Sequence, residues 1–396
     1  MKFRKFGRVF LASVVSLGLA FGITACGTSN TIDFLFVTAS ANNNVAVFTV
    51  DSLSGSLVPI PDSPYSSGGR NPVAEVTSPN GKNLYVVNHD DNTLVQFGIG
   101  TDGKLYPQNT YNTPGTEPTA VAINTAGTFL FVVDNFQPHN PAYTDLNPGP
   151  GAVVVYPITT SGSLGTPVAN GSLTYFPVCN SPVAVDAVSG QSVLYVVNKA
   201  GCGTGNGAIS AFTIGSDGTL AAAPGSPFGA GVSPSSLASD PTGKFLYVTD
   251  SASNELINFT IQSTGVLITQ PNGPTKTDVA PDAVTVDPRG FYIYVANFTA
   301  GTVNTYSIDQ STGNPSGNAT FSTAVDTGPT AVLVEPALGR YVYTSNFLDA
   351  TVSGLQLNPS TGSLIQTQTP AYHAPGQPSA LAAITHGNHS IQTTQK

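Results

Sequence analysis

Three residues with acid–base or anion-binding side chains stand out in a chain of which only 9% of residues are charged. Arg70 in "GGRNP" and Glu117 in "GTEP" come just before a proline, and His89 follows the apolar run "LYVVN". An arginine can bind a carboxylate through paired hydrogen bonds, and a histidine with a carboxylate can transfer a proton. The trio could therefore bind a carboxylate or polarise a carbonyl group, provided that the fold brings it together. The alternative is that all three are solvated loop residues.

The segments around these residues recur seven times, which identifies the elements that must position them. Each repeat has an aromatic anchor in an apolar run such as "FLYVTD". The anchors are Phe36, Tyr85, Phe131, Tyr195, Tyr247, Tyr294 and Tyr343. A glycine turn such as "STGSL" follows each anchor, and a run such as "PDAVTVDPRG" precedes the next one. A period near 50 residues with three landmarks is typical of a repeat fold.

Each repeat predicts four strands. The proline run gives the first strand and the aromatic run the second. The third alternates apolar and polar residues, as in "TLVQFGI", and the fourth is a polar edge. Radial stacking of four-stranded sheets is a β-propeller. We therefore predict an all-β, seven-bladed β-propeller in which strands at 33–39 and 377–385 close the ring within one blade.

The N-terminus has the features of an export signal. Four basic residues precede the apolar run 9–23, which is shorter than the ~20 residues of a membrane-spanning helix. The segment "ITAC" resembles the lipobox of bacterial lipoproteins, which implies that residues 1–25 are removed and Cys26 is lipidated. Gly27 after the cysteine implies sorting to the outer membrane. An ordinary secretory signal or an uncleaved anchor is the alternative.

This division leaves a lipidated tether at 26–32, a propeller at 33–389 and a polar tail at 390–396. Removing residues 1–25 takes away four of the 13 basic residues and none of the 22 acidic ones, which leaves a formal net charge of −13. Such a chain repels nucleic acids. The expected partners are the membrane, through the lipid on Cys26, and an envelope protein, a glycan or a small molecule.

The repeats resemble the YVTN-type repeats of the lactonase family of seven-bladed propellers, which includes bacterial 6-phosphogluconolactonases. The pieces that carry the resemblance are "LYVVN", "LYVTD", "IYVAN", the "STGSL" turns and "PDAVTVDPRG", and they cover about residues 33–389. The resemblance implies a site at one mouth of the central channel, with His and Arg residues around the proline of the first strand. In this chain no His or Arg follows that proline, and Asp282 is the one carboxylate there.

Two insertions are expected on the face that bears this mouth. The distance from anchor to turn glycine is 31 residues in the third repeat and 23 in the fourth, against 18 or 19 elsewhere. The larger insertion, 134–151, is predicted as a lid or a partner-binding loop. The residues of that loop singled out for partner contact are Asp134, Phe136, His139, Tyr143 and Asp145.

Cys179 and Cys202 lie on the same face, in the loops that flank one blade. Because export favours oxidation, we predict a disulfide, which would contribute about 3 kcal/mol; two free thiols are the alternative. No metal site and no cofactor are expected.

Two functions remain open at this point. The first is a lipid-anchored scaffold that binds a ligand or partner on the insertion-bearing face. The second is a lactone hydrolase with a divergent site, in which Arg70, His89 and Glu117 or Asp282 replace the residues of the family.

Overall fold

The apolar runs form strands with both faces buried. All six residues of β6 (Asn83–Asn88) and of β27 (Tyr341–Asn346) are buried. The computed structural model describes residues 30–138, 149–203 and 205–390, and every regular element in them is a β-strand. Cys26, the predicted signal at 1–25 and loop residues His139, Tyr143 and Asp145 lie outside this part of the chain. Within it, no helix is long and apolar enough to cross a membrane.

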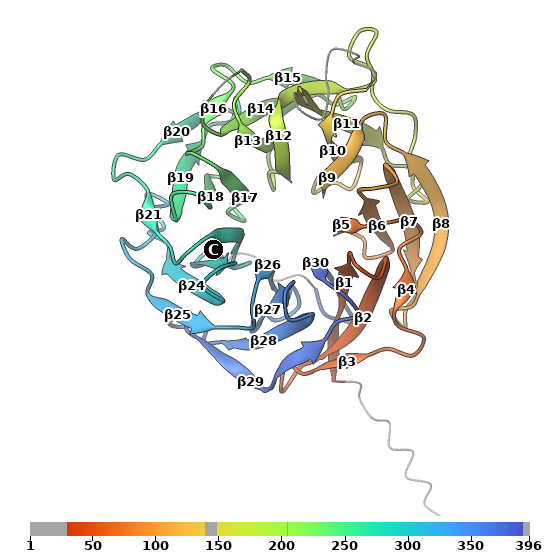
Figure 1. Ribbon diagram of the computed structural model, residues 1–396, viewed down its shortest axis with the longest axis vertical. Helices are drawn as coiled ribbons and strands as arrows, with labels where there is room; N and C mark the ends of the chain where they lie inside the picture. The colour runs from red at the N-terminus through yellow and green to blue at the C-terminus, as the bar shows by residue number, and fades with distance from the viewer. Residues whose placement is uncertain (1–29, 139–148, 204, 391–396) are drawn as a thin grey trace, which may run out of the picture.

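The strands form seven blades around a common axis (Figure 1), which confirms the predicted all-β propeller. The innermost strands, from blade 1 to blade 7, are β30 (Pro378–Thr385), β5 (Pro72–Thr77), β9 (Thr116–Ile123), β12 (Phe176–Ala187), β17 (Pro234–Ser239), β22 (Pro281–Val286) and β26 (Pro329–Val334). The second strands are β1 (Thr31–Ala39), β6, β10 (Phe129–Phe136), β13 (Val193–Ala200), β18 (Phe245–Asp250), β23 (Tyr292–Asn297) and β27.

The outer half of each blade is built in the same order. The third strands are β2 (Asn44–Asp51), β7 (Thr93–Ile99), β11 (Pro150–Pro157), β14 (Ala208–Ile214), β19 (Glu255–Ile261), β24 (Thr302–Ser307) and β28 (Thr351–Leu357). The outermost strands are β3 (Leu57–Pro59), β4 (Tyr65–Ser66), β8 (Leu105–Asn112), β15 (Leu220–Ala222), β16 (Phe228–Gly229), β20 (Leu267–Thr269), β21 (Thr275–Lys276), β25 (Phe321–Ala324) and β29 (Leu364–His373).

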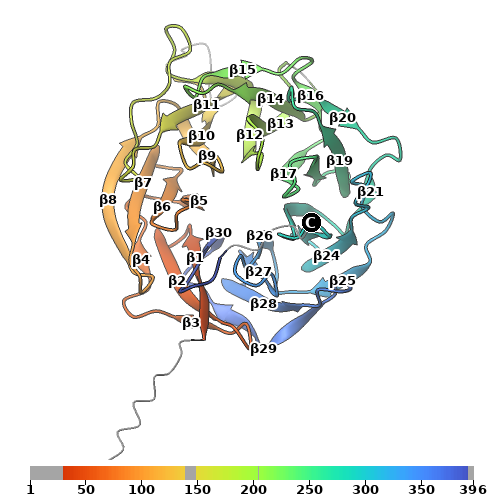
Figure 2. The ribbon, with the colours of Figure 1, turned by 180° about the vertical axis from the view of Figure 1, so that it is seen from behind.

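Blades 3 and 4 share one strand. The first half of β12 pairs with β11 as the outer strand of blade 3, and its second half pairs with β13 as the inner strand of blade 4. Blade 1 combines the two ends of the chain, because β30 pairs antiparallel with β1 from Asp33–Thr385 to Ala39–Pro378. Each inner strand contacts the next one around the ring, and the view from behind shows the same circular order (Figure 2).

The anchors and the glycine turns are two halves of one contact between blades. In five blades the buried anchor tyrosine donates its hydroxyl to the carbonyl oxygen of the turn glycine of the next blade. These bonds are Tyr85–Gly162 at 2.6 Å, Tyr195–Gly265 at 3.1 Å, Tyr247–Gly313 at 2.8 Å, Tyr294–Gly362 at 3.4 Å and Tyr343–Gly55 at 2.8 Å. The other two anchors, Phe36 and Phe131, lack the hydroxyl. A turn glycine is required because the turn has positive φ; in addition, a Cβ on Gly55 would collide with the ring of Tyr341.

A buried carboxyl pair lies between blades 1 and 7. The side chains of Asp33 and Glu335 are fully buried, and burial together with the Glu335 carboxylate raises the pKa of Asp33 to about 10. Glu335 is held as an acceptor by the backbone N–H groups of Leu338 and Arg340. Tyr343, which is fully buried, faces the same pair. Asp33 therefore keeps its proton in the folded protein at neutral pH.

Removing an anchor hydroxyl should weaken the ring. Tyr247→Phe or Tyr343→Phe leaves a buried glycine carbonyl without its donor, so we expect a loss of about 1–2 kcal/mol each in the free energy of unfolding. Urea denaturation followed by circular dichroism measures this loss. Tyr106→Phe, at a residue with 51% of its surface exposed, is the control and should change stability by less than about 0.5 kcal/mol. Equal effects at the buried and exposed sites would contradict a role for the hydroxyl.

The carboxyl pair predicts a pH-dependent stability. The folded state binds the Asp33 proton more tightly than the unfolded state does. Stability from this group is therefore greatest in acid and is lost as the pH rises toward the raised pKa. Asp33→Asn keeps a neutral donor there, so its melting temperature should exceed that of the wild type increasingly from pH 4.5 to pH 9. Asp62→Asn, on an exposed loop, is the control. A melting-temperature difference for Asp33→Asn that does not change with pH would contradict a protonated Asp33 in the folded protein.

Candidate functional site

A β-bulge at the start of every inner strand aims one side chain at the propeller axis. The register shifts at the residue after the first proline in all seven blades. A bulged residue lies outside the regular pairing, and its side chain can be redirected. The bulged residues are Val73, Thr119, Val183, Ser235, Asp282, Thr330 and Ser379, and all seven line a central cavity of about 690 Å³.

Four of these bulged residues have hydroxyls that bind the neighbouring blade. Each hydroxyl donates to the carbonyl oxygen of the proline that precedes the bulged residue of the next inner strand. The bonds are Thr119–Pro182 at 2.9 Å, Ser235–Pro281 at 2.7 Å, Thr330–Pro378 at 3.1 Å and Ser379–Pro72 at 2.7 Å. These four hydroxyls are engaged in holding the ring, so the remaining reactive group in the row is the carboxyl of Asp282.

Among the described residues that line the cavity, Asp282 is the one carboxylate, and Ala, Val, Ser and Thr side chains lie in the same wall. Burial raises its pKa to about 6, while the positive charge of Lys199 opposes the rise. Lys199 follows Asn198 toward the end of β13, is exposed and also lines the cavity. The carboxyl of Asp282 is thus ionised near neutral pH and still close to its own pKa, which suits a general base.

The structure brings two of the three residues of the predicted trio together. His89 lines the cavity, and its Nε2 lies 4.0 Å from Oε2 of Glu117 on the next blade. The other ring nitrogen, Nδ1, lies 2.8 Å from Oδ1 of Asp90. Glu117 also accepts a hydrogen bond from Nδ2 of Asn135 at 3.0 Å. Asp90 therefore holds one side of the His89 ring by a hydrogen bond, and the Glu117 carboxylate lies near the other side.

The predicted role of Arg70 in this trio is not supported. Its Nε donates to Oδ1 of Asp91 at 2.7 Å, its side chain is 65% exposed, and it does not line the central cavity. Asp91 also accepts the backbone N–H of Arg70. A carboxylate one residue beyond Asp90 therefore holds the guanidinium on the surface of its own blade.

The sequence analysis did not predict two of the lining residues, Lys199 and Phe347, although an alignment of the repeats places both at the position of His89. His89, Lys199 and Phe347 all line the cavity, and each directly follows the Asn that closes a second strand. Alignment of the seven repeats at this position gives Ser40, His89, Asn135, Lys199, Ser251, Phe298 and Phe347. The side chains at this position vary from blade to blade between polar and aromatic groups, and three of them line the cavity together with the bulged residues.

The partner-binding role predicted for the start of the long loop is wrong for Asp134. This side chain is fully buried in β10, and its Oδ2 accepts the backbone N–H of Gly115 at 2.9 Å. Burial raises the pKa of Asp134 to about 7. Phe136 ends β10 and pairs with Thr116. The first residues of the predicted insertion, 134–136, therefore belong to β10 of blade 3.

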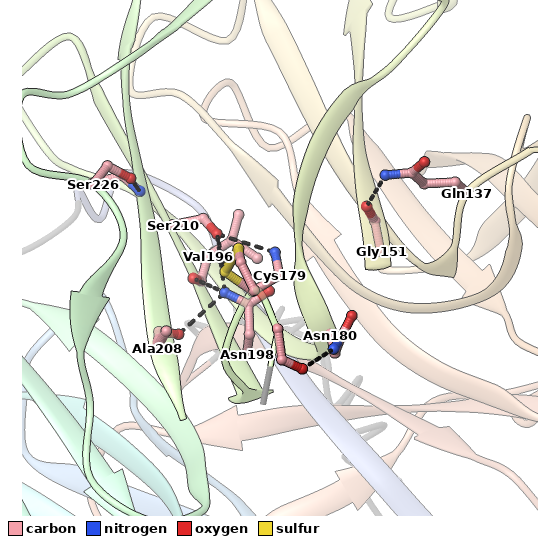
Figure 3. Close-up of a disulfide and its surroundings, with 12 residues drawn as sticks. Gln137, Gly151, Cys179, Asn180, Val196, Asn198, Ala208, Ser210 and Ser226 are labelled. Atoms are coloured by element: carbon pink, nitrogen blue, oxygen red, sulfur yellow. Dashed lines mark hydrogen bonds between the residues drawn. A yellow bond between two sulfur atoms is a disulfide. The ribbon is translucent and has the colours of Figure 1, made fainter. Parts of the chain in front are cut away.

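The predicted disulfide is present between Cys179 and Cys202, whose Cα atoms are 4.3 Å apart. Figure 3 shows the bridge beside Asn198, whose Nδ2 donates to the carbonyl oxygen of Ala208 and to Oγ of Ser210. The bridge joins β12 to the β13–β14 loop. Because Lys199 lies at the base of that loop, the disulfide fixes the segment that presents the lysine to the cavity.

The charge of Lys199 should be measurable at Asp282. Lys199→Met removes the positive charge that lowers the pKa of Asp282, so the carboxyl should titrate at a higher pH than the value of about 6 in the wild type. Carbon-13 NMR of labelled aspartate, with Asp282→Asn for assignment, measures this shift. Lys104→Met removes a lysine of blade 2 that is paired with Asp62, and it should leave the titration unchanged. An unchanged titration in Lys199→Met would contradict the electrostatic coupling.

The comparisons with known proteins agree with this architecture. The family model described as lactonase, 7-bladed beta-propeller matches residues 28–140 and 169–389. No curated protein matches the chain.

Solved structures share the fold at low sequence identity. A candidate 6-phosphogluconolactonase from Bacteroides uniformis is 18% identical, with a TM-score of 0.71 over 90% of this chain and 100% of that one. A candidate 6-phosphogluconolactonase from Bacteroides fragilis is also 18% identical, with a TM-score of 0.72 over 90% and 99%. The periplasmic gluconolactonase of Pseudomonas aeruginosa is 19% identical, with a TM-score of 0.72 over 89% and 99%. The chain belongs to the lactonase family of seven-bladed β-propellers.

Proposed function

We propose that this propeller hydrolyses a sugar lactone at the channel mouth, with Asp282 as the general base. The observation that carries the proposal is the single carboxylate in the cavity wall, whose pKa burial raises to about 6. At pH 7 this group is deprotonated and can take a proton from water. The family membership and the three gluconolactonase-type neighbours support a lactone as the substrate class.

The proposed reaction has two steps, which are joined by a tetrahedral intermediate. A water molecule attacks the lactone carbonyl carbon while the carboxylate of Asp282 accepts its proton. The tetrahedral intermediate has a negative oxygen, which the ammonium group of Lys199 stabilises. The ring C–O bond then breaks, the proton returns to the leaving alkoxide, and the product is a hydroxy acid. His89, held by Asp90 and close to Glu117, is positioned to donate a hydrogen bond to the leaving oxygen or to a sugar hydroxyl.

The cavity suits a ligand of this size and polarity. Its volume of about 690 Å³ lies within the usual range for small-molecule sites. The wall combines Ala, Val and Leu side chains with Ser and Thr side chains, and Phe347 lies at the mouth. If Cys26 is lipidated as the sequence predicts, the reaction takes place in the cell envelope.

A second function, ligand binding without turnover, is favoured by one observation. The hydroxyls of the bulged row are already bound to the next blade, and no His or Arg occupies that row. The channel would then hold an anionic or hydroxylated ligand at Lys199 and His89 as a scaffold, which is the first function that the sequence suggested.

Lactone turnover by charge-matched variants separates the two functions. We expect the wild type to release protons from glucono-δ-lactone or its 6-phosphate faster than buffer does. Asp282→Asn should lower kcat by about 10²–10⁴-fold because it removes the base. Lys199→Met should lower kcat by about 10²-fold because it removes the charge that stabilises the oxyanion. A pH-stat assay measures proton release.

The control variant is Lys104→Met, which removes one lysine outside the channel and should keep full activity. Saturable binding of the hydroxy acid without lactone turnover would favour the scaffold. Turnover that Asp282→Asn leaves unchanged would refute the assigned base.

A further inference from the structure

One seam between blades departs from the repeat. Two residues before each anchor, five blades have an aromatic side chain and blade 4 has Val193, but blade 2 has Asn83. The aromatic residues are Phe34, Phe129, Phe245, Tyr292 and Tyr341. Each of their rings packs where a Cβ on the turn glycine of the next blade would lie, and in blade 2 the amide of Asn83 occupies this place against Gly162.

The missing ring leaves a hollow between blades 2 and 3. Its volume is about 470 Å³, and it lies on the face of the glycine turns, opposite the channel mouth described above. The seam that contains Phe34 has a hollow of about 310 Å³, and the seam that contains Phe245 has one of about 90 Å³. Among these three seams, the hollow is largest where the aromatic ring is absent.

The wall of this hollow is polar but uncharged. Ser78, Asn80 and Asn83 come from blade 2, and Thr128, Thr159 and Thr160 come from blade 3. Within the part of the chain that the structure describes, none of its lining residues is Asp, Glu, Lys, Arg or His, whereas the Phe34 seam includes Lys82 and the Phe245 seam includes Asp240 and Lys244. A charged ligand would lose its hydration here without gaining a counter-charge.

A buried relay fixes the amide of Asn83. Tyr111 and Asn109 both donate to Oε1 of Gln96, at 3.3 Å and 2.9 Å, and Gln96 donates from Nε2 to Oδ1 of Asn83 at 2.9 Å. Gln96 has 1% and Asn83 has 6% of its surface exposed. Among the described residues, Nδ2 of Asn83 donates to no acceptor. The relay thus leaves the Nδ2 donor of Asn83 beside Gly162 in the wall of the hollow, where an acceptor atom of a ligand can reach it.

We propose that the seam between blades 2 and 3 binds a neutral, polyhydroxylated ligand, that is, one ring of a carbohydrate. Sugar hydroxyls accept from the amide of Asn83 and exchange hydrogen bonds with the Ser, Asn and Thr side chains around it. Ile158 and Pro79 supply apolar surface for the carbon face of the ring. The site is separate from the channel and does not depend on lactone hydrolysis.

The test is saturation-transfer NMR with glucose, galactose, mannose and N-acetylglucosamine at millimolar concentration. We expect at least one of these sugars to bind the wild type. Asn83→Phe restores the ring of the other blades and should weaken binding about ten-fold or more. Asn83→Phe with Gln96→Val reproduces the pair found in blades 1 and 3, Phe34 with Val47 and Phe129 with Val155, and tests the same loss without an orphaned glutamine.

Two further variants test whether the sugar binds through the Asn83 donor and whether it binds outside the channel. Asn83→Asp replaces the Nδ2 donor with an acceptor oxygen, adds a negative charge at nearly the same size, and should also weaken binding. Asp282→Asn with Lys199→Met alters the channel and should leave sugar binding unchanged. No binding of any of the four sugars to the wild type would overturn the proposal. It would also fail if binding survived the Asn83 variants or disappeared in the channel variant.

Discussion

The hydrogen bond from a buried anchor tyrosine to the turn glycine of the next blade is the contact on which the propeller depends. A blade is too thin to bury its own faces, so its stability lies in contacts with its neighbours. At five of the seven contacts between neighbouring blades, the tyrosine hydroxyl fixes the position of one blade relative to the next. Pairing of β1 with β30 extends these contacts around the full circle.

The candidate site is built from the same repeat that holds the blades together. The fold repeats one bulge seven times, and the bulge directs seven side chains to the axis. Four of them are hydroxyls that bind the next proline carbonyl and so hold the inner ring. The residues that could take part in a reaction lie where the sequence departs from the other repeats. They are Asp282 in the bulged row, and His89 and Lys199 at the position after the Asn of the second strand. The seam at Asn83 follows the same rule on the opposite face.

Sequence reasoning predicted what the repeat determines. The blades follow from landmarks spaced about 50 residues apart, the family resemblance drew attention to the position of Asp282, and the bridge between Cys179 and Cys202 follows from the face that their loops share and from the expected export. Sequence reasoning failed for residues whose position depends on which nearby group the side chain binds. Arg70 pairs with Asp91, and Asp134 turns inward to cap Gly115, because hydrogen bonds to nearby groups outweigh the pattern. Lys199 was missed because it was not aligned with His89, which occupies the same position of the repeat.

The pH dependence of kcat/KM for a sugar lactone tests the central claim, that the buried Asp282 beside Lys199 acts as the base. The account predicts a rate that rises with pH through an apparent pKa near 6 in the wild type, because the free enzyme must lose the Asp282 proton. In Lys199→Met the same limb should move to higher pH, with a lower plateau. A profile that is flat between pH 5 and pH 8, or a limb that Lys199→Met leaves in place, would contradict it.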